Sequence, residues 1–181
     1  STIKVAQKAR IRLERARKQL LVAIESLPKS ARFNIIAYSN KVTAWQGGLK
    51  PASKSAIKSA GKFVKEFLAR GATYTDDALK RAFEDNEADT VVLLSDGAPT
   101  KPEFPSSFLI EQILKDIANL NAARKMRINT FGFEGIGLWP DKIPGLPSGP
   151  LPLPTLKDVE VFTGFMKQLA EDNHGSFQSI K

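Results

Sequence analysis

The residues best suited to chemistry stand at the end of the most apolar run of the chain. Ser95-Asp96-Gly97 directly follows Thr90–Leu94. Ligands of open α/β sheets bind beside the carboxyl ends of the strands, so we expect Asp96 to lie at such an edge. A carboxylate there suits a hard divalent cation, which prefers oxygen ligands. An aspartate after a strand can equally cap the turn that follows, and spacing alone leaves both interpretations open.

A second polar stretch, Gly-Ala-Thr-Tyr-Thr-Asp-Asp over residues 71–77, precedes a predicted helix. Thr75 is expected to be the N-cap of that helix, and Asp76 and Asp77 suit the positive potential of its first turn. Successive helix residues do not share a face, so we do not interpret the two carboxylates as a catalytic pair. The stretch is therefore interpreted as a helix start.

Composition excludes several kinds of catalytic and cofactor site. The chain of 181 residues has no cysteine, which excludes disulfides, thiolate zinc sites, iron–sulfur clusters and a cysteine nucleophile. Its one histidine, His174, is interpreted as a loop residue at a helix end. No GxxxxGKS/T motif is present, and Pro140 occupies the third glycine position of the dinucleotide fingerprint that Gly135-Ile-Gly137 begins. Without a convincing nucleophile–base pair, we expect no enzyme.

The net charge of +8 is unevenly distributed along the chain. Residues 1–70 hold 16 basic and three acidic side chains, whereas residues 71–181 hold 11 basic and 16 acidic ones. This asymmetry can indicate an anionic partner, such as a nucleic acid, or a basic face opposite an acidic site. We favour lysine-rich outer faces of two long helices, because charged helix faces are common.

Periodicity predicts alternating helices and strands. Apolar residues at helical spacing predict helices over Val5–Leu27, Pro51–Arg70, Thr75–Phe83, Phe108–Asn121 and Asp158–Asp172. Short runs rich in β-formers predict strands over Arg32–Tyr38, Val42–Trp45, Thr90–Leu94, Arg127–Phe133 and Ser176–Ile180. Pro51 suits the first turn of the second helix, and Gly71 is expected to end that helix.

This element order predicts a three-layer, doubly wound α/β fold with a mostly parallel sheet and helices on both faces. The length fits one domain over residues 1–181. Residues 135–156 are rich in proline and glycine and lack apolar periodicity, so we expect an irregular surface loop inserted in that domain. No apolar run approaches the roughly 20 residues of a membrane-spanning helix.

The polar stretches, taken in order, resemble the von Willebrand factor A (vWA) domain family. Gly71-Ala72-Thr73, then Ala78-Leu79, then Ser95-Asp96-Gly97 match motifs of that family in order and spacing. The flanks are also similar: Leu27-Pro28 before the strand at 32–38, and the helix end Leu169–Gly175. The Trp-containing segment Ala44-Trp45-Gln46 is similar to the bacterial type in particular. The resemblance covers nearly the whole chain except residues 135–156.

The resemblance implies a metal-ion-dependent adhesion site. The matching positions are Thr73 and Asp96, which would help to hold one Mg²⁺ or Mn²⁺ whose octahedron a partner's carboxylate completes. The family's DxSxS motif and the first strand before it have no match here, since the chain opens on a predicted helix. That strand is central in the family, so we expect the chain to be incomplete at its N-terminus. An upstream segment or another chain would supply the missing strand.

The function expected from these observations is a non-enzymatic interaction module that binds an acidic residue of a protein partner through the cation. Residues around the metal would form the rim of the binding surface: Ser39, Asn40, Tyr74, Ser95, Gly97 and residues 98–100. The alternative is a binder of nucleic acid or of an anionic surface, using basic residues of 4–18 and Lys54, Lys58, Lys62 and Lys65. Aromatic residues are not interleaved with these basic ones, so we expect no nucleic-acid partner.

Overall fold

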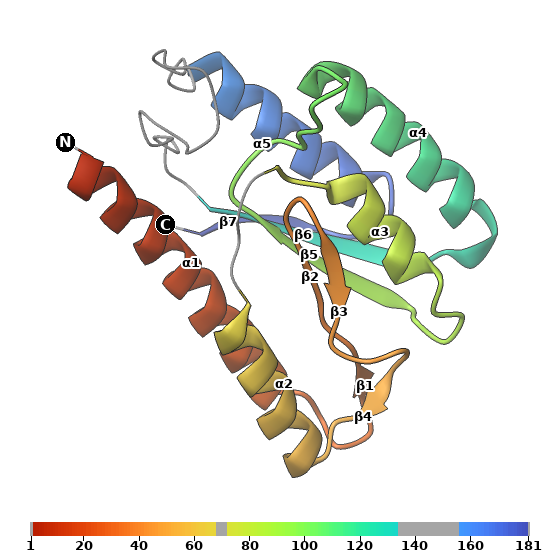
Figure 1. Ribbon diagram of the computed structural model, residues 1–181. Coiled ribbons are helices and arrows are strands. Elements are labelled where there is room, and N and C mark those ends of the chain that lie inside the picture. Colours follow the sequence, from red (N-terminus) through yellow and green to blue (C-terminus); the bar gives the residue numbers. More distant parts are fainter. Residues whose placement is uncertain (1, 68–71, 134–155, 181) are drawn as a thin grey trace.

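The computed structural model describes residues 2–67, 72–133 and 156–180 of the chain (Figure 1). The elements, in chain order, are α1 (Thr2–Glu25), β1 (Arg32–Phe33), β2 (Ile36–Tyr38), β3 (Val42–Ala44), β4 (Lys50–Pro51), α2 (Lys54–Glu66), α3 (Thr75–Phe83), β5 (Thr90–Ser95), α4 (Ser106–Arg124), β6 (Arg127–Phe133), α5 (Leu156–Glu171) and β7 (Phe177–Ile180). Figure 1 shows α3, α4 and α5 on one side of the strands and α1 with α2 on the other. This is the predicted three-layer α/β arrangement.

The parallel part of the sheet consists of β5, β6 and β7, in that order. Leu93 of β5 lies opposite Thr130 of β6, which lies opposite Phe177 of β7. One face of this three-stranded sheet packs against α3, α4 and α5. The buried core between them includes Leu79, Ile113, Ile117, Ile128, Met166 and Leu169. A second core joins α1, α2 and the early strands through Ile24, Phe33, Ile35, Ala60 and Val64. Apolar faces of the predicted helices therefore form both cores.

The strand predicted over Arg32–Tyr38 is divided in two, which corrects the sequence interpretation. The Asn34 side chain replaces backbone pairing at that point: its Oδ1 accepts from the backbone N–H groups of Ile35 (2.8 Å) and Gln46 (3.1 Å). Its Nδ2 donates to the Gln46 carbonyl at 2.9 Å. On either side, β1 pairs with β4 and β2 pairs with β3, both antiparallel. The described strands therefore form three separate sheets, and only the three-stranded sheet β5–β6–β7 is parallel, whereas one mostly parallel sheet was predicted.

Two predicted helix starts are also wrong. Pro51 lies in β4 opposite Arg32, and α2 begins three residues later because Ser53 caps it by accepting from the Ala56 N–H at 3.2 Å. For α3 the N-cap is Tyr74, which makes no side-chain capping bond, and Thr75 is the first helical residue. The loop predicted over 135–156 lies outside the described residues, apart from Leu156, which begins α5.

Strands β2 and β5 are not paired with each other in the described part of the chain. β2 pairs with β3 and β5 pairs with β6. A single side chain bridges the two strands, since the Tyr38 hydroxyl donates to the Leu94 carbonyl at 3.1 Å. Val92, in the middle of the most apolar strand, is 52% exposed. β5 therefore has the composition of a buried strand but lies at the edge of its sheet in the described part of the chain.

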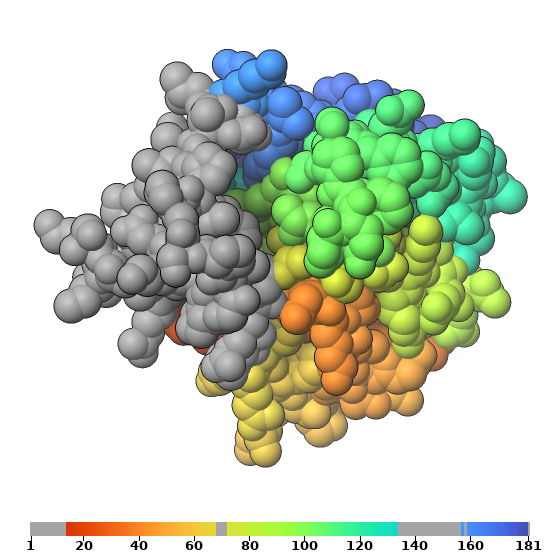
Figure 2. Space-filling view, turned by 45° about the horizontal axis from the view of Figure 1, so that its top comes forward, coloured from red at the N-terminus to blue at the C-terminus, as the bar shows by residue number. Residues whose placement is uncertain are grey.

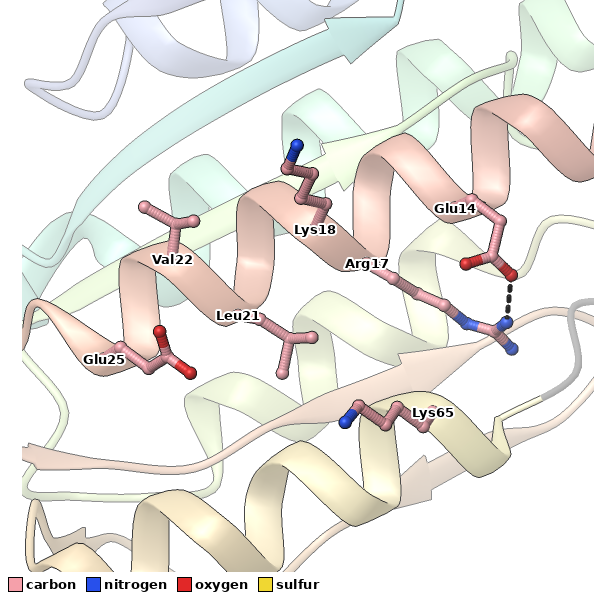
Figure 3. Close-up of a pocket in the computed structure, with 7 residues that line it drawn as sticks. All are labelled: Glu14, Arg17, Lys18, Leu21, Val22, Glu25 and Lys65. Atoms are coloured by element: carbon pink, nitrogen blue, oxygen red, sulfur yellow. Dashed lines mark hydrogen bonds and ion pairs between the residues drawn. The ribbon is translucent and has the colours of Figure 1, made fainter.

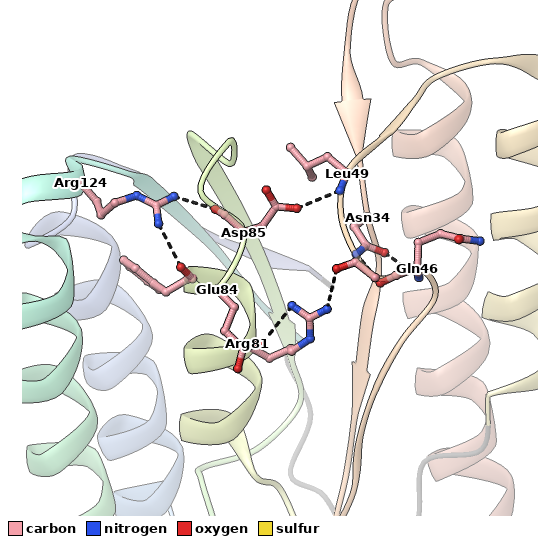
Figure 4. Close-up of polar contacts among 9 residues, drawn as sticks. Asn34, Gln46, Leu49, Arg81, Glu84, Asp85 and Arg124 are labelled. Atoms are coloured by element: carbon pink, nitrogen blue, oxygen red, sulfur yellow. Dashed lines mark hydrogen bonds and ion pairs between the residues drawn. The ribbon is translucent and has the colours of Figure 1, made fainter.

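Polar contacts fasten the opposite, amino end of the sheet (Figure 4). The Arg124 guanidinium, at the end of α4, donates to the carbonyls of Phe83 (2.9 Å), Asp85 (2.7 Å) and Ala88 (3.1 Å). The Asp85 carboxylate accepts from the Leu49 N–H at 2.8 Å. These bonds tie the loop before β5 to α4 and to the segment before β4, which leaves the carboxyl edge as the open end of the sheet.

Candidate functional site at the carboxyl edge

Asp96 stands directly after β5, and its side chain is exposed. In the described ranges it makes no hydrogen bond or ion pair. The turn is held instead by Ser95, whose Oγ donates to the Gly97 carbonyl at 3.0 Å. The alternative in which Asp96 caps this turn is therefore not what the structure has. Asp96 therefore presents an exposed carboxylate at the carboxyl edge, with no partner among the described residues.

Thr73 is held against the loop that follows Asp96. Its backbone N–H donates to the Thr100 Oγ1 at 2.8 Å, and the Thr100 N–H donates back to the Thr73 carbonyl at 3.0 Å. The Thr73 hydroxyl itself makes no hydrogen bond within the described residues. The two predicted cation ligands thus belong to two adjoining loops, and both carry uncommitted oxygen atoms.

The predicted rim residues come together at this edge, but they are not equally accessible. The Tyr74 N–H donates to the Ser39 carbonyl at 3.0 Å, which joins the β2–β3 turn to the start of α3. Asn40 is exposed, whereas Ser39 and Ser95 are buried. The two serines therefore support the edge from below, and Asn40 and Tyr74 contribute to its surface.

The phenol of Tyr38 lies under the same edge, a placement that the sequence did not reveal. Burial raises the pKa of Tyr38 from 10.0 to about 12, and the negative charge of Asp96 adds to the rise, while hydrogen bonding with Ser95 and the nearby Thr75 hydroxyl opposes it. Thr75 is 1% exposed, and its Oγ1 makes no hydrogen bond of good geometry. An orphaned hydroxyl thus lies in the first turn of α3, beside the phenol.

Lys101 is a further residue at the edge that sequence reasoning missed. Its Nζ lies 2.6 Å from Asp76 Oδ2, 3.0 Å from Asp77 Oδ2 and 5.1 Å from the centroid of the Tyr74 ring. Burial lowers the pKa of Lys101, but hydrogen bonds and charge attraction from the two aspartates outweigh it and raise the pKa overall. Asp76 and Asp77 lie in the first turn of α3, as expected for a helix start, and one ammonium group from another loop reaches both carboxylates.

The oxygen atoms present suit a hard cation but form only part of its shell. In the described ranges, no three acidic or histidine side chains lie together as a metal site. The Asp96 carboxylate and the Thr73 hydroxyl are ligands of the type that Mg²⁺ accepts, and Mg²⁺ requires six oxygens in a near-ideal octahedron. Water or residues beyond these two would have to supply the rest. His174, exposed and in a left-handed turn (φ 58°), is no ligand candidate.

Known proteins resemble this chain in sequence. The family model described as the von Willebrand factor type A domain matches residues 3–138. Inter-alpha-trypsin inhibitor heavy chain H3 of Bos taurus is 27% identical over 170 residues, which is 93% of this chain and 17% of that protein. Heavy chain H1 of Mesocricetus auratus is 27% identical over 120 residues, which is 60% of this chain and 13% of that protein. The chain thus spans a small part of these relatives.

Solved structures agree on the fold. A von Willebrand factor type A protein from Catenulispora acidiphila superposes with a TM-score of 0.68 at 16% identity, covering 97% of this chain and 35% of that one. The conserved hypothetical protein BatB from Bacteroides thetaiotaomicron gives 0.63 at 14% identity, covering 94% and 80%. None of the helices in the described ranges combines the length and apolarity that crossing a bilayer needs. The chain belongs to the von Willebrand factor type A domain family, a family of protein-interaction modules.

Proposed function

We propose that this chain is a non-enzymatic module that binds an acidic side chain of a protein partner through Mg²⁺ or Mn²⁺ at the carboxyl edge. Asp96 would be one ligand of the cation and Thr73 another, directly or through water. The observation that carries the proposal is the exposed Asp96 carboxylate after β5, which adjoins the Thr73 loop; neither this carboxylate nor the Thr73 hydroxyl has a partner among the described residues. The partner's carboxylate would occupy an open coordination position.

The charges around the edge support a role for a cation. Asp76, Asp77 and Asp96 carry three negative charges there, Lys101 supplies a positive charge that the first two already engage, and Lys41 stands exposed in the β2–β3 turn. A carboxylate approaching Asp96 alone would meet like charge, which is unfavourable at contact distance. A divalent cation reverses the sign of the field at this point. Hydroxyl ligands leave the cation under-neutralised and therefore attractive to an acidic partner.

The proposal extends to the neighbouring strand edges. The facing edges of β2 and β5 would receive an extended segment of polypeptide, from upstream of this sequence or from another chain, with apolar residues against Val92. The support is the exposure of Val92 (52%) on a strand of buried composition, together with the lack of pairing between β2 and β5 in the described chain. Parallel sheets are normally covered on both faces, and natural proteins normally protect exposed apolar edge strands, so an edge of this composition favours an additional strand.

Isothermal calorimetry with Mg²⁺ tests the cation site, on the chain with its natural flanking sequence. Saturable binding is expected, and Asp96→Ala should weaken it at least tenfold because a charged oxygen ligand is lost. Thr73→Ala should weaken it less. Glu111→Ala, which removes an exposed carboxylate on α4, is the matched control and should change nothing. Unchanged Mg²⁺ affinity in Asp96→Ala would remove Asp96 from the site.

The alternative, an anionic surface bound by the basic helices, receives weaker support. Lys54, Lys58, Lys62 and Lys65 are all exposed on α2, as this reading requires. Between α1 and α2, however, the surface mixes both signs of charge (Figure 3): its lining includes Glu14, Arg17, Lys18, Glu25 and Lys65. Arg17 is already engaged by Glu14 at 2.8 Å and by the Phe67 carbonyl. A steep loss of binding with salt and indifference to EDTA would favour this alternative.

A further inference from the structure

Two aromatic side chains stand exposed beside the carboxyl edge. Phe104 is 47% exposed and Phe108 is 46% exposed. Their rings stack on each other, with centroids 5.1 Å apart and planes 25° apart, instead of entering the core. Large apolar side chains left in water are unfavourable, and well-placed aromatic residues are typical anchors of protein interfaces. We call these two residues the aromatic pair.

The aromatic pair is fixed in position relative to the proposed cation site. The Phe104 N–H donates to the Lys101 carbonyl at 3.3 Å, and the Lys101 ammonium is held by Asp76 and Asp77. One residue earlier, Thr100 exchanges two hydrogen bonds with Thr73. On the other side, Phe108 lies in the first turn of α4. The pair is therefore preorganised, so that little conformational entropy is lost when a partner binds it.

The aromatic pair is continuous with the carboxyl edge of the sheet. Figure 2 shows the green surface of the segment around residues 100–110 directly against the yellow-green start of α3 and the orange β2–β3 turn. The loop that begins at the Asp96 turn carries Phe104 and leads into the first turn of α4, which carries Phe108. The hydrogen bonds from Phe104 to Lys101 and between Thr100 and Thr73 connect this loop to the start of α3, so the aromatic pair borders the surface on which we propose that the partner binds.

We propose that the aromatic pair binds a bulky apolar side chain, such as leucine or phenylalanine, that flanks the acidic residue of the protein partner. This inference rests on the proposed function and names the partner more closely: a segment with a carboxylate and an adjacent large apolar group. A second copy of the chain is a poorer occupant. A two-fold contact through this surface would bring the two copies of the Asp96 site together, either as two carboxylates or as two bound cations, and like charges across an interface are strongly unfavourable.

The test uses immobilised peptides of about twelve residues with one central aspartate, flanked on both sides by alanine, leucine or phenylalanine, in Mg²⁺. Binding of the chain with its natural flanking sequence is measured by interferometry. We expect the leucine and phenylalanine peptides to bind better than the alanine peptide. Phe104→Ala/Phe108→Ala should reduce that binding at least tenfold and leave the alanine peptide unchanged. Leu120→Ala, an exposed apolar residue elsewhere on α4, is the matched control and should bind all three as the parent does.

The outcomes separate the two proposals. Loss of all binding in EDTA and in Asp96→Ala supports the cation site, whatever the flanking residues do. If the cation dependence holds but the doubly substituted protein binds all three peptides as the parent does, the aromatic pair is not a contact and the inference fails. If no peptide binds the parent in Mg²⁺, both proposals fail. If sedimentation shows a dimer that the double substitution dissociates, a second copy is the occupant and the inference is overturned.

Discussion

Replacing Tyr38 by phenylalanine should change how the stability of the protein depends on pH. The Tyr38 hydroxyl donates to the Leu94 carbonyl at 3.1 Å and has its pKa raised to about 12, chiefly by burial. The unfolded chain releases this proton near pH 10, whereas the folded chain holds it until about pH 12. The stabilisation from the protonated phenol is therefore fully present below pH 10 and is lost as the pH rises toward 12.

The magnitude follows from the size of the shift. A difference of two pKa units corresponds to about 2.7 kcal/mol, of which about 1.4 kcal/mol is lost by pH 11. At pH 8 the parent should exceed Tyr38→Phe by about 1 kcal/mol, the usual net value of one hydrogen bond. The two stability curves should therefore cross between pH 10 and 11, and the phenylalanine variant should be the more stable protein above that point.

Urea denaturation of the two proteins from pH 8 to 11.5 measures this difference, and lysine titration cancels because both proteins share every lysine. The chain has no cysteine and only two tyrosines, so Tyr74→Phe leaves Tyr38 as the single phenol for an absorbance titration. That titration should have its midpoint near pH 12 in the native protein and near pH 10 in denaturant. A stability difference that stays constant from pH 8 to 11.5 would refute the reasoning.

Other substitutions test the packing that positions the edge. At Gly175, a Cβ would lie 1.8 Å from the Ile128 carbonyl oxygen, so Gly175→Ala should destabilise the protein by about 2 kcal/mol or more in urea denaturation. At Gly164, within α5, a Cβ meets nothing within 4 Å, so Gly164→Ala is the matched control and should stabilise by about 0.5–1 kcal/mol; equal effects of the two changes would contradict this account. Arg124→Met leaves three carbonyls without their charged donor and should cost about 2 kcal/mol in the same assay, and a midpoint shifted by less than 0.1 M urea would count against it.

The sequence was sufficient where periodicity and position along the chain decide the structure. The helical spacing over residues 108–121 and 158–172 and the apolar runs at 90–94 and 127–133 correspond to α4, α5, β5 and β6. The rule that ligands bind beside the carboxyl ends of strands placed Asp96 at this edge, and the resemblance to the vWA family placed Thr73 and the β2–β3 turn beside it. These features depend on local pattern and on general topology, and both can be read from residue order.

Contacts between distant residues could not be read in this way. The strand over 32–38 is interrupted because the Asn34 side chain bonds to Gln46, 12 residues away. Asp76 and Asp77 share an ion-pair partner because Lys101, 25 residues away from Asp76, reaches both of them from another loop. The sequence contains one sign of the aromatic pair: Phe104 and Phe108 are four residues apart, on either side of Pro105 at the start of α4. Helical periodicity alone would have assigned two apolar residues at this spacing to the core.

At the carboxyl edge, the polar groups that stabilise the backbone are not the ones that we propose to bind the cation. Ser95 holds the turn after β5, and Thr100 holds the backbone of Thr73, so neither interaction uses the Asp96 carboxylate or the Thr73 hydroxyl. Lys101 neutralises charge on α3 without reaching Asp96. If Asp96 stabilised the fold, its carboxylate would be expected to form a hydrogen bond or an ion pair with the residues around it. Because other residues stabilise its surroundings and Asp96 has no partner among the described residues, its substitution should impair the proposed binding without weakening the fold.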